Sequence, residues 1–288
     1  MKIAVFMGGI SSEREISLKS GEAILNSLLK QGYDAYGVDI NKDNLITGFM
    51  ENEYDLAYLA LHGGYGENGT FQGLLDMLGK PYTGSGALES AVSMDKAYTK
   101  ALAKEIGLNV AKTYHKVEEI DKYPVVIKPT RDGSSVGIYF CNNEEEAREA
   151  LEKLKLQKPI IEEEIKGEEL TVGVMNNKSM GVVRILPKNE YYDFESKYAE
   201  GGSVHEYPAK ISKIAYDRAM KDALKIHEEI GLSGISRSDF ILKDDKVYFL
   251  EVNTSPGMTN TSLIPDIGTL QGYSFDDLVK IMVETFKK

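Results

Sequence analysis

Residues 235–257, with the sequence ISRSDFILKDDKVYFLEVNTSPG, decide the fold and its chemistry. Two runs of strand-forming residues flank the tight-turn signal Lys-Asp-Asp, so this stretch predicts a β-hairpin. Side chains alternate along a strand, which puts Arg237 on one face with Asp239, and Glu251 on one face with Asn253. Carboxylate and amide oxygens suit Mg²⁺, and a planar guanidinium suits an anionic oxygen. The alternative is a solvated hairpin with charged edges, but the turn-forming Asn-Thr-Ser-Pro-Gly run favours a metal site.

The first third of the chain alternates strands with helices. This order is typical of a parallel, doubly wound sheet, so residues 1–92 are predicted to form an N-terminal α/β lobe. In such sheets ligands bind in loops at the carboxyl ends of strands, and two loops here, 8–12 and 62–69, are rich in glycine. Glu13 follows the first loop, and His62 opens the second, where a structural role and a ligand contact are equally consistent with the sequence. The predicted elements are strands at 2–7, 33–40 and 54–61, and helices at 13–30 and 70–79.

Beyond residue 93 the pattern changes to short strands mixed with helices. It predicts two α+β lobes, a central lobe over residues 93–180 and a C-terminal lobe over 181–288. The polar, glycine-rich segment 187–207 has no regular period, and a long segment of this kind in a compact enzyme is usually a lid. The predicted helices are 88–106, 144–156, 212–230 and 274–287, and the predicted strands are 124–128, 136–140, 159–164, 169–175, 180–186 and the two strands of the hairpin.

A glycine- and serine-rich loop, residues 131–137, separates two strands of the central lobe. Glycine lets the backbone approach phosphate oxygens, and Lys128 on the preceding strand would supply a fixed cation. The Gly-Lys-Ser/Thr spacing of a Walker loop is absent. Taken alone, the loop is as consistent with an ordinary hairpin tip as with a phosphate site.

Composition and missing motifs exclude several classes of function. The 288-residue chain has a net charge of -11, whereas nucleic-acid binding needs clustered lysine and arginine. No apolar run approaches the length of a membrane span, and the single cysteine, Cys141, excludes an intramolecular disulfide and a cysteine-based metal site. The Gly-x-Gly-x-x-Gly pattern of NAD-binding folds and any Ser/His/Asp set are absent. We therefore expect a cytoplasmic protein without nucleic-acid or membrane partners.

Eight short motifs follow one another along almost the whole chain. They are Gly8-Gly9 with residues 12–18, residues 61–63 with 66–70, 82–86, 93–96, Lys128-Pro129 with 133–137, Lys197-Tyr198, 237–239 and 251–259. Each is modest alone, and the run Asn-Thr-Ser-Pro-Gly-Met-Thr, residues 253–259, is the most diagnostic. Together and in this order they resemble the D-alanine–D-alanine ligases of the ATP-grasp superfamily. The resemblance implies three lobes, the last two of which sandwich ATP.

The resemblance also implies a reaction. ATP would phosphorylate the carboxylate of one D-alanine, and the amine of a second D-alanine would then attack the D-alanyl phosphate and release phosphate. Such chemistry needs charge neutralisation and positioning more than a protein nucleophile. The product would serve peptidoglycan synthesis. The resemblance further implies two Mg²⁺ ions, with Mn²⁺ as an alternative, an optional monovalent cation, and a homodimer.

Residue roles follow from the same resemblance. The metal ligands are Asp239, Glu251 and Asn253. The ATP contacts are Lys96, Lys128, Ser135 and Lys197 at the phosphates, Glu169 at the ribose, and Glu162, Glu163 and Ile165 at the adenine. The substrate contacts are Glu13, His62, Arg237, Gly257, Ser262 and Leu263. The catalytic residues are Glu13, Ser134, Tyr198, Arg237 and Gly257, of which Arg237 and the Gly257 amide stabilise an oxyanion.

One departure from the family concerns Glu164, where relatives often carry a large aromatic or apolar residue, so contact with the adenine stays open there. Two alternatives remain: a different ATP-grasp carboxylate–amine ligase, and a non-catalytic ATP-binding protein of the same fold. The first should lack substrate residues such as Glu13 or Ser262, and the second should lack acidic ligands or Arg237. All are present. The Lys197-Tyr198 pair favours D-alanine over D-lactate as the second substrate.

Overall fold

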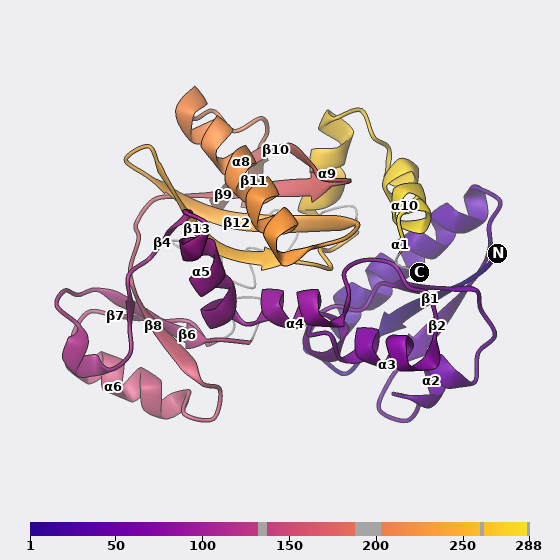
Figure 1. Ribbon diagram of the computed structural model, residues 1–288, viewed down its shortest axis with the longest axis horizontal. Helices are drawn as coiled ribbons and strands as arrows, with labels where there is room; N and C mark the ends of the chain where they lie inside the picture. The colour runs from indigo at the N-terminus through magenta and orange to yellow at the C-terminus, as the bar shows by residue number, and fades with distance from the viewer. Residues whose placement is uncertain (132–136, 188–202, 260–261, 287–288) are drawn as a thin grey trace.

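The computed structural model describes residues 1–131, 137–187, 203–259 and 262–286. Three β-sheets organise these residues, and each lies in its own region of the molecule (Figure 1). A three-stranded sheet comes first in the chain, a four-stranded sheet lies in the middle of it, and a six-stranded sheet is built mostly from its second half. No helix in the described part of the chain is long and apolar enough to cross a membrane.

The first sheet has β1 (Lys2–Gly8) at its centre, between β2 (Asp34–Ile40) and β3 (Leu56–Leu59), and both pairings are parallel. Strand β1 is buried on both faces because helices cover both sides of the sheet. Val5 shares a core with α1 (Arg14–Lys30), whereas Phe6 stacks on Phe49 of α2 (Thr47–Met50), on the side of α3 (Thr70–Leu78). This arrangement confirms the predicted doubly wound α/β lobe.

The helix predicted over residues 88–106 is two helices, so that prediction is wrong. Helix α4 (Ala87–Met94) ends at Asp95, whose backbone is extended, and α5 (Lys96–Glu105) begins at the next residue. The Asp95 carboxylate accepts hydrogen bonds from the amides of Ala97 and Tyr98, as an N-cap does. The 3.6-residue period runs across this break, and only the capping preference of aspartate marks it in the sequence.

The four-stranded sheet is antiparallel and small. Helix α6 (Glu144–Lys153) packs on it, and Val125 and Ile127 meet Ala147 and Leu154 in a separate core. In spatial order its strands are β5 (Thr113–Tyr114), β8 (Pro159–Glu163), β6 (Val125–Pro129) and β7 (Tyr139–Cys141).

The six-stranded sheet contains the hairpin that was predicted within residues 235–257. Helices α5 and α8 (Lys213–Ile230) share a core with one face of it. The predicted lobe boundary between residues 180 and 181 falls inside β10, and β10 pairs with β9 in one sheet. The sequence does not show this, because the composition of a strand does not reveal which strand it pairs with. Residues 203–206, predicted as part of a loop, form β11. The spatial order is β11 (Ser203–Glu206), β10 (Lys178–Pro187), β9 (Glu168–Met175), β12 (Ile235–Lys243), β13 (Lys246–Asn253) and β4 (Asn109–Val110).

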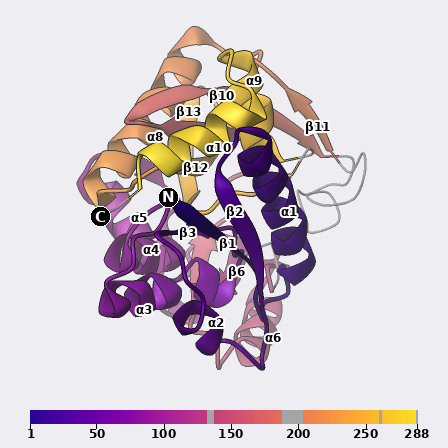
Figure 2. The same cartoon turned by 90° about the vertical axis from the view of Figure 1, so that its right-hand side faces the viewer.

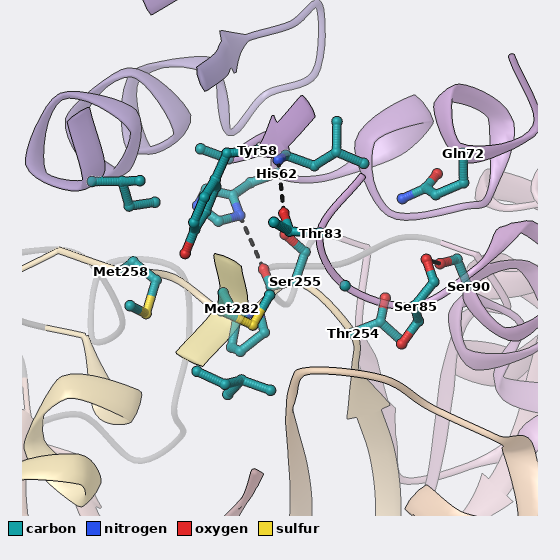
Figure 3. Close-up of a pocket in the computed structure, with 16 residues that line it drawn as sticks. Tyr58, His62, Gln72, Thr83, Ser85, Ser90, Thr254, Ser255, Met258 and Met282 are labelled. Carbon is teal, nitrogen blue, oxygen red and sulfur yellow. Dashed lines mark hydrogen bonds between the residues drawn. The ribbon is translucent and has the colours of Figure 1, made fainter. Parts of the chain in front are cut away.

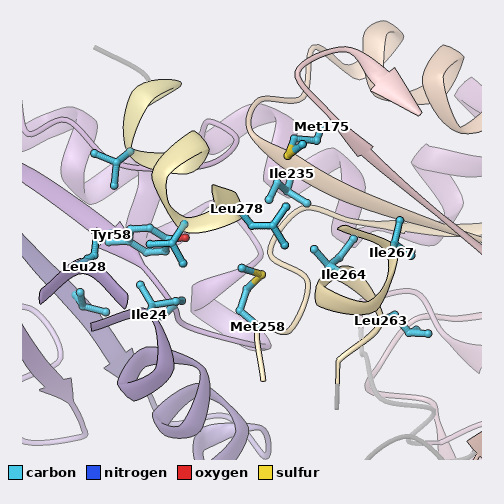
Figure 4. Packing of buried hydrophobic residues seen from close by; sticks show 14 of the residues in the cluster. Ile24, Leu28, Tyr58, Met175, Ile235, Met258, Leu263, Ile264, Ile267 and Leu278 are labelled. Atoms are coloured by element: carbon cyan, nitrogen blue, oxygen red, sulfur yellow. The ribbon is translucent and has the colours of Figure 1, made fainter. Parts of the chain in front are cut away.

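The other face of this sheet shares its core with the N-terminal lobe. Ile264 of α9 (Leu263–Leu270) and Leu278 of α10 (Phe275–Glu284) lie in one apolar cluster with Ile24 of α1 (Figure 4). Helix α10 crosses α1 and packs against it (Figure 2), and Lys30 and Ser27 both contact the Asp276 carboxylate, at 2.6 and 2.7 Å. The first and last segments of the chain are therefore held together as one body.

Candidate active site

The hairpin β12–β13 forms as predicted and brings its four polar residues together. Arg237 lies opposite Asn253, and Asp239 lies opposite Glu251. The Arg237 guanidinium donates to both carboxylate oxygens of Asp239, at 3.0 and 2.8 Å, and the Thr171 hydroxyl donates to the same carboxylate at 2.6 Å. The four polar hairpin residues are partly buried, whereas the strand residues between them are buried in the core. The charged side chains of the hairpin are thus paired rather than individually solvated, which favours a site over a solvated hairpin.

Lys96 reaches the hairpin from the first residue of α5. Its Nζ lies 2.9 Å from Glu251 Oε2, and the lysine is 9% exposed. The Lys96 amide donates to the Thr130 carbonyl at 2.9 Å, and Arg131 Nε donates to Asp95 Oδ2 at 2.7 Å. The beginning of the glycine- and serine-rich loop is thus fixed to the N-terminus of α5, beside the hairpin.

Lys128 lies on β6 in a buried cluster that the sequence did not predict. Its Nζ lies 2.9 Å from Glu162 Oε2, and the same carboxylate receives two hydrogen bonds from Lys100 of α5, the one to Oε2 at 2.5 Å. Burial opposes the charge of Glu162, but the two ammonium groups outweigh it and lower the pKa of Glu162 to about 2. Burial and the charge of Lys128 lower the pKa of Lys100 to about 8. The one available signal for Lys100 was its helical spacing of four residues from Lys96.

The segment that was predicted to contact adenine connects the four-stranded sheet to the six-stranded sheet, between β8 and β9. The Glu163 carboxylate accepts from the Lys112 amide at 3.0 Å, and Glu164 lies 3.6 Å from Lys166. Ile165 is partly exposed, and Glu169, also partly exposed, lies near the start of β9. The Glu162 side chain points instead into the lysine cluster.

Glu13 and the two glycine-rich loops meet at the carboxyl end of the first sheet. Glu13 is buried directly before α1. Gly63 has a φ of +66°, which favours glycine, and a Cβ there would crowd the other loop, at 3.1 Å from Ser11 Oγ and 3.2 Å from Glu13 Oε2. Ser11 Oγ donates to the His62 carbonyl at 2.6 Å. Both glycine-rich loops thus lie at the carboxyl edge of the sheet, where ligands bind in folds of this kind.

His62 connects this edge to the loop after the hairpin (Figure 3). Its Nδ1 lies 3.0 Å from the Ser255 carbonyl, and its Nε2 lies 3.0 Å from Ser20 Oγ. Because the Ser255 carbonyl can only accept, Nδ1 of the neutral imidazole carries the proton. Nε2 therefore accepts from the Ser20 hydroxyl, whose oxygen also accepts from the Met258 amide at 3.2 Å. Ser20 was missed by the sequence, where a serine inside a helix carries no signal of its own.

Gly257 and Ser262 lie against each other at the start of α9. A Cβ on Gly257 would lie 2.8 Å from Ser262 Oγ, which also receives the Thr259 amide at 3.0 Å. Ser262 is the N-cap of α9, a helix that the sequence did not predict. Leu263 is the first helical residue, and its side chain belongs to the shared apolar core.

Comparison with known proteins decides the family. A sequence model described as "D-ala D-ala ligase C-terminus" matches residues 92–284, and one described as "D-ala D-ala ligase N-terminus" matches residues 46–85. The chain belongs to the D-alanine–D-alanine ligase family. It is 63% identical to a "D-alanine--D-alanine ligase" of Fusobacterium nucleatum, over 99% of both chains. It is 41% identical to a "D-alanine--D-alanine ligase" of Aquifex aeolicus, over 98% of this chain and 100% of the other.

Solved structures confirm the predicted ATP-grasp fold. The crystal structure of the D-alanine–D-alanine ligase from Bacillus anthracis complexed with ATP has a TM-score of 0.85 at 32% identity, covering 99% of this chain and 96% of that one. The VanG D-Ala:D-Ser ligase from Enterococcus faecalis also has a TM-score of 0.85, at 29% identity, covering 98% of each chain. The prediction of a ligase from this family is therefore confirmed.

Four predicted site residues of the ligase lie outside the described residues. Ser134 and Ser135 belong to the glycine- and serine-rich loop, and Lys197 and Tyr198 belong to the predicted lid. Their assigned roles stay predictions.

The predicted metal ligands of the ligase, Asp239, Glu251 and Asn253, are a chemically suitable set. In the described part of the chain, no three or more His, Cys, Asp and Glu side chains gather as a metal site by themselves. The predicted set instead combines two carboxylates with one amide, on register-paired strands, and these are hard oxygens of the kind that Mg²⁺ shares with phosphates. Arg237 and Lys96 balance the two carboxylates in this structure.

Proposed function

We propose that this enzyme joins two D-alanine molecules to D-alanyl-D-alanine at the expense of ATP. A carboxylate oxygen of the first D-alanine attacks the γ-phosphorus, and the bond from that phosphorus to the oxygen of ADP breaks. The amine of the second D-alanine attacks the carbonyl carbon of the D-alanyl phosphate and loses a proton, and inorganic phosphate leaves with the electrons of the C–O bond. The observation that carries the proposal is the hairpin cluster of Arg237, Asp239, Glu251 and Asn253 in a chain of this family.

The nucleotide is proposed to lie between the four- and six-stranded sheets. Lys96 and Lys128 are proposed to contact its phosphates, since both are buried cations whose carboxylate partners lie on these two sheets. Glu169 and the segment with Glu162, Glu163 and Ile165 are proposed to contact the ribose and the adenine. For Ser135 and Lys197, the support is the family resemblance alone.

The amino acids are proposed to lie where the N-terminal sheet faces the loop after the hairpin. The buried Glu13 carboxylate suits the ammonium group of the first D-alanine, with His62 beside it. Arg237 and the Gly257 amide would stabilise the oxyanion that forms on the attacked carbonyl. Ser262 and the Leu263 amide, at the N-terminus of α9, suit the carboxylate of the second substrate. Ser134 and Tyr198 are proposed as catalytic by resemblance.

Asp239, Glu251 and Asn253 are the residues that would hold two Mg²⁺ ions, or Mn²⁺ in their place. Bound there, the metal would neutralise charge on the phosphates. The three side chains themselves supply the oxygen ligands, and Arg237 and Lys96 orient the two carboxylates. A monovalent cation is retained as an optional activator.

We also propose a role in peptidoglycan synthesis, and so in cell-wall formation and cell shape, with the reaction taking place in the cytoplasm, where ATP is available. A homodimer is proposed from the family habit. Exposed apolar side chains on the N-terminal lobe support it, among them Met77, which is 88% exposed, and Leu88, which is 72% exposed.

The test is phosphate release from ATP and Mg²⁺ with D-alanine, against L-alanine, D-lactate and D-serine as second substrates. We expect the dipeptide of D-alanine to dominate at neutral pH. A dominant depsipeptide, or a dominant D-alanyl-D-serine product, would overturn the assignment of D-alanine as the second substrate.

Arg237→Ala is expected to lower kcat by about 10² to 10³ and leave ATP binding intact. Arg148→Ala, which removes another arginine–carboxylate pair, on α6, is the matched control. Unchanged turnover in the Arg237 variant would refute its role.

A further inference from the structure

Lys100, Glu162 and Lys128 form a buried cluster of two ammonium groups around one carboxylate. The three residues are 5%, 2% and 8% exposed. Both lysines lie within 2.9 Å of the Glu162 carboxylate. Two ammonium groups share one carboxylate, so the cluster as a whole carries a net positive charge.

Burial of an unbalanced charge costs stability, and a fold keeps such a charge where it has another use. The neighbouring carboxylate, Glu251, also attracts both lysines, but it is itself paired with Lys96, so three ammonium groups still face two carboxylates. The lowered pKa of Lys100, caused by burial and by the charge of Lys128, shows that the ammonium of Lys100 is held against an opposing environment.

The position of Lys100 explains how the cluster is held. Lys96 and Lys100 are four residues apart, and such residues lie on the same side of a helix. Lys96 contacts Glu251 on the six-stranded sheet, and Lys100 contacts Glu162 on the four-stranded sheet. One face of α5 therefore ties together the two sheets between which the nucleotide is proposed to lie, and Figure 1 shows α5 at this junction.

We propose that Lys100 is a positioning residue for the nucleotide: by sharing the Glu162 carboxylate, it prevents that carboxylate from neutralising Lys128 and leaves a net positive charge for the anionic triphosphate. This inference rests on the proposed use of ATP at Lys128. Without Lys100, Glu162 and Lys128 would form a neutral pair, and the attraction for phosphate would fall. The folded state, in contrast, would lose an uncompensated charge.

The experiment compares three methionine variants of the full-length enzyme, because methionine keeps the length of lysine without its charge. They are Lys100→Met, Lys128→Met and, as matched control, Lys104→Met, whose side chain is exposed on the same helix. The measurements are the KM for ATP, the KM for D-alanine, kcat, and the melting temperature. For Lys100→Met we expect a KM for ATP at least about tenfold higher, which corresponds to ~1.4 kcal/mol. The KM for D-alanine should stay within about twofold, and the melting temperature should equal or exceed that of Lys104→Met.

Two further variants separate a charge effect from damage to the fold. Lys100→Arg keeps the charge and should restore the KM for ATP to within about threefold. The double variant Lys100→Met with Glu162→Gln again leaves one positive charge, on Lys128, and should bind ATP more tightly than Lys100→Met alone. If Lys100→Met does not fold, these two variants still decide the matter: a KM for ATP at least about tenfold above the wild-type value in both of them overturns the proposal.

The remaining outcomes are equally decisive. An unchanged KM for ATP in Lys100→Met, alongside a raised KM in Lys128→Met, overturns the role of Lys100 and leaves the nucleotide site in place. An equal rise in the KM for D-alanine also overturns it, because a general distortion would produce that result. An unchanged KM for ATP in Lys128→Met overturns the proposed nucleotide site and the inference with it.

Discussion

Ser20→Ala removes one oxygen atom that connects the N-terminal lobe to the loop after the hairpin. Ser20 is fully buried, its Oγ accepts from the Met258 amide at 3.2 Å, and its hydroxyl donates to His62 Nε2 at 3.0 Å. Alanine fits the same space, so no cavity arises and the effect comes from the two polar groups that lose their partner. Since His62 also donates to the Ser255 carbonyl, the loss reaches the Asn-Thr-Ser-Pro-Gly run from two sides.

The magnitude follows from those two groups. A buried donor or acceptor that loses its partner costs about 1–3 kcal/mol, so two such groups lower the free energy of unfolding by about 2 kcal/mol or more. Without the Ser20 hydroxyl as a donor to Nε2, the orientation of the His62 ring is also held less firmly. We therefore expect the KM for D-alanine to rise by about tenfold, while the KM for ATP stays within about twofold.

The assay pairs urea denaturation with steady-state kinetics, in which each substrate is varied in turn. Ser93→Ala is the matched control, because Ser93 is also buried but its hydroxyl has no hydrogen-bond partner among the described residues. We expect Ser93→Ala to change the free energy of unfolding by less than about 0.5 kcal/mol or to raise it. Equal denaturation midpoints for the Ser20 and Ser93 variants, with equal KM values for D-alanine, would refute the reasoning.

Two further predictions concern a buried histidine and a glycine. Burial lowers the pKa of His227 from 6.5 to about 4, so as the pH falls the unfolded chain takes up a proton there before the folded chain does. The free energy of unfolding therefore falls by up to about 3 kcal/mol as the pH drops from 6.5 towards 4. His227→Gln should flatten that part of a pH series of denaturation curves, whereas His115→Gln, at an exposed site, should not; parallel curves for wild type and His227→Gln would contradict this. Gly257→Ala should raise the KM for D-alanine by about tenfold, since the new Cβ would lie 2.8 Å from Ser262 Oγ, and kinetics identical to wild type would show that Ser262 can move aside without consequence.

The sequence predicted the parts of the fold in which local pattern and tertiary packing agree. Strand β1 shows this, because its apolar run, its position before two glycines and its burial on both faces have one explanation. The hairpin shows it as well, since alternation alone placed Arg237 with Asp239. Helix α9 escaped prediction because Pro265 and Gly268 are poor helix formers, and its stability comes from burial of Ile264 and Ile267 against residues far away in the sequence.

The residues of the candidate site likewise fall into those that local sequence pattern indicates and those that only tertiary contacts reveal. Glu13, His62 and the hairpin could be predicted because each follows a strand end or a glycine-rich loop, where backbone geometry limits the alternatives. Lys100 and Ser20 could not, because both lie inside helices and obtain their meaning from partners 62 and 42 residues away. The sequence motifs point to the groups that are proposed to touch the substrates, but they carry little information about the residues that hold those groups in place.

These supporting contacts explain how the three sheets contribute to one site. The four-stranded sheet has a core that shares no residue with the other cores, so within the described residues its attachment depends on a few links. Chain connections supply two, at residues 111–112 and 164–167, and the side chain of Lys100 on α5 supplies another. The N-terminal lobe, in contrast, shares the large core around Ile264 with the six-stranded sheet. The proposed amino-acid side of the site is therefore built on extensive apolar packing, whereas the proposed nucleotide side depends on charges that cross between sheets. We expect the two sides to respond differently to salt and to charge-removing substitutions.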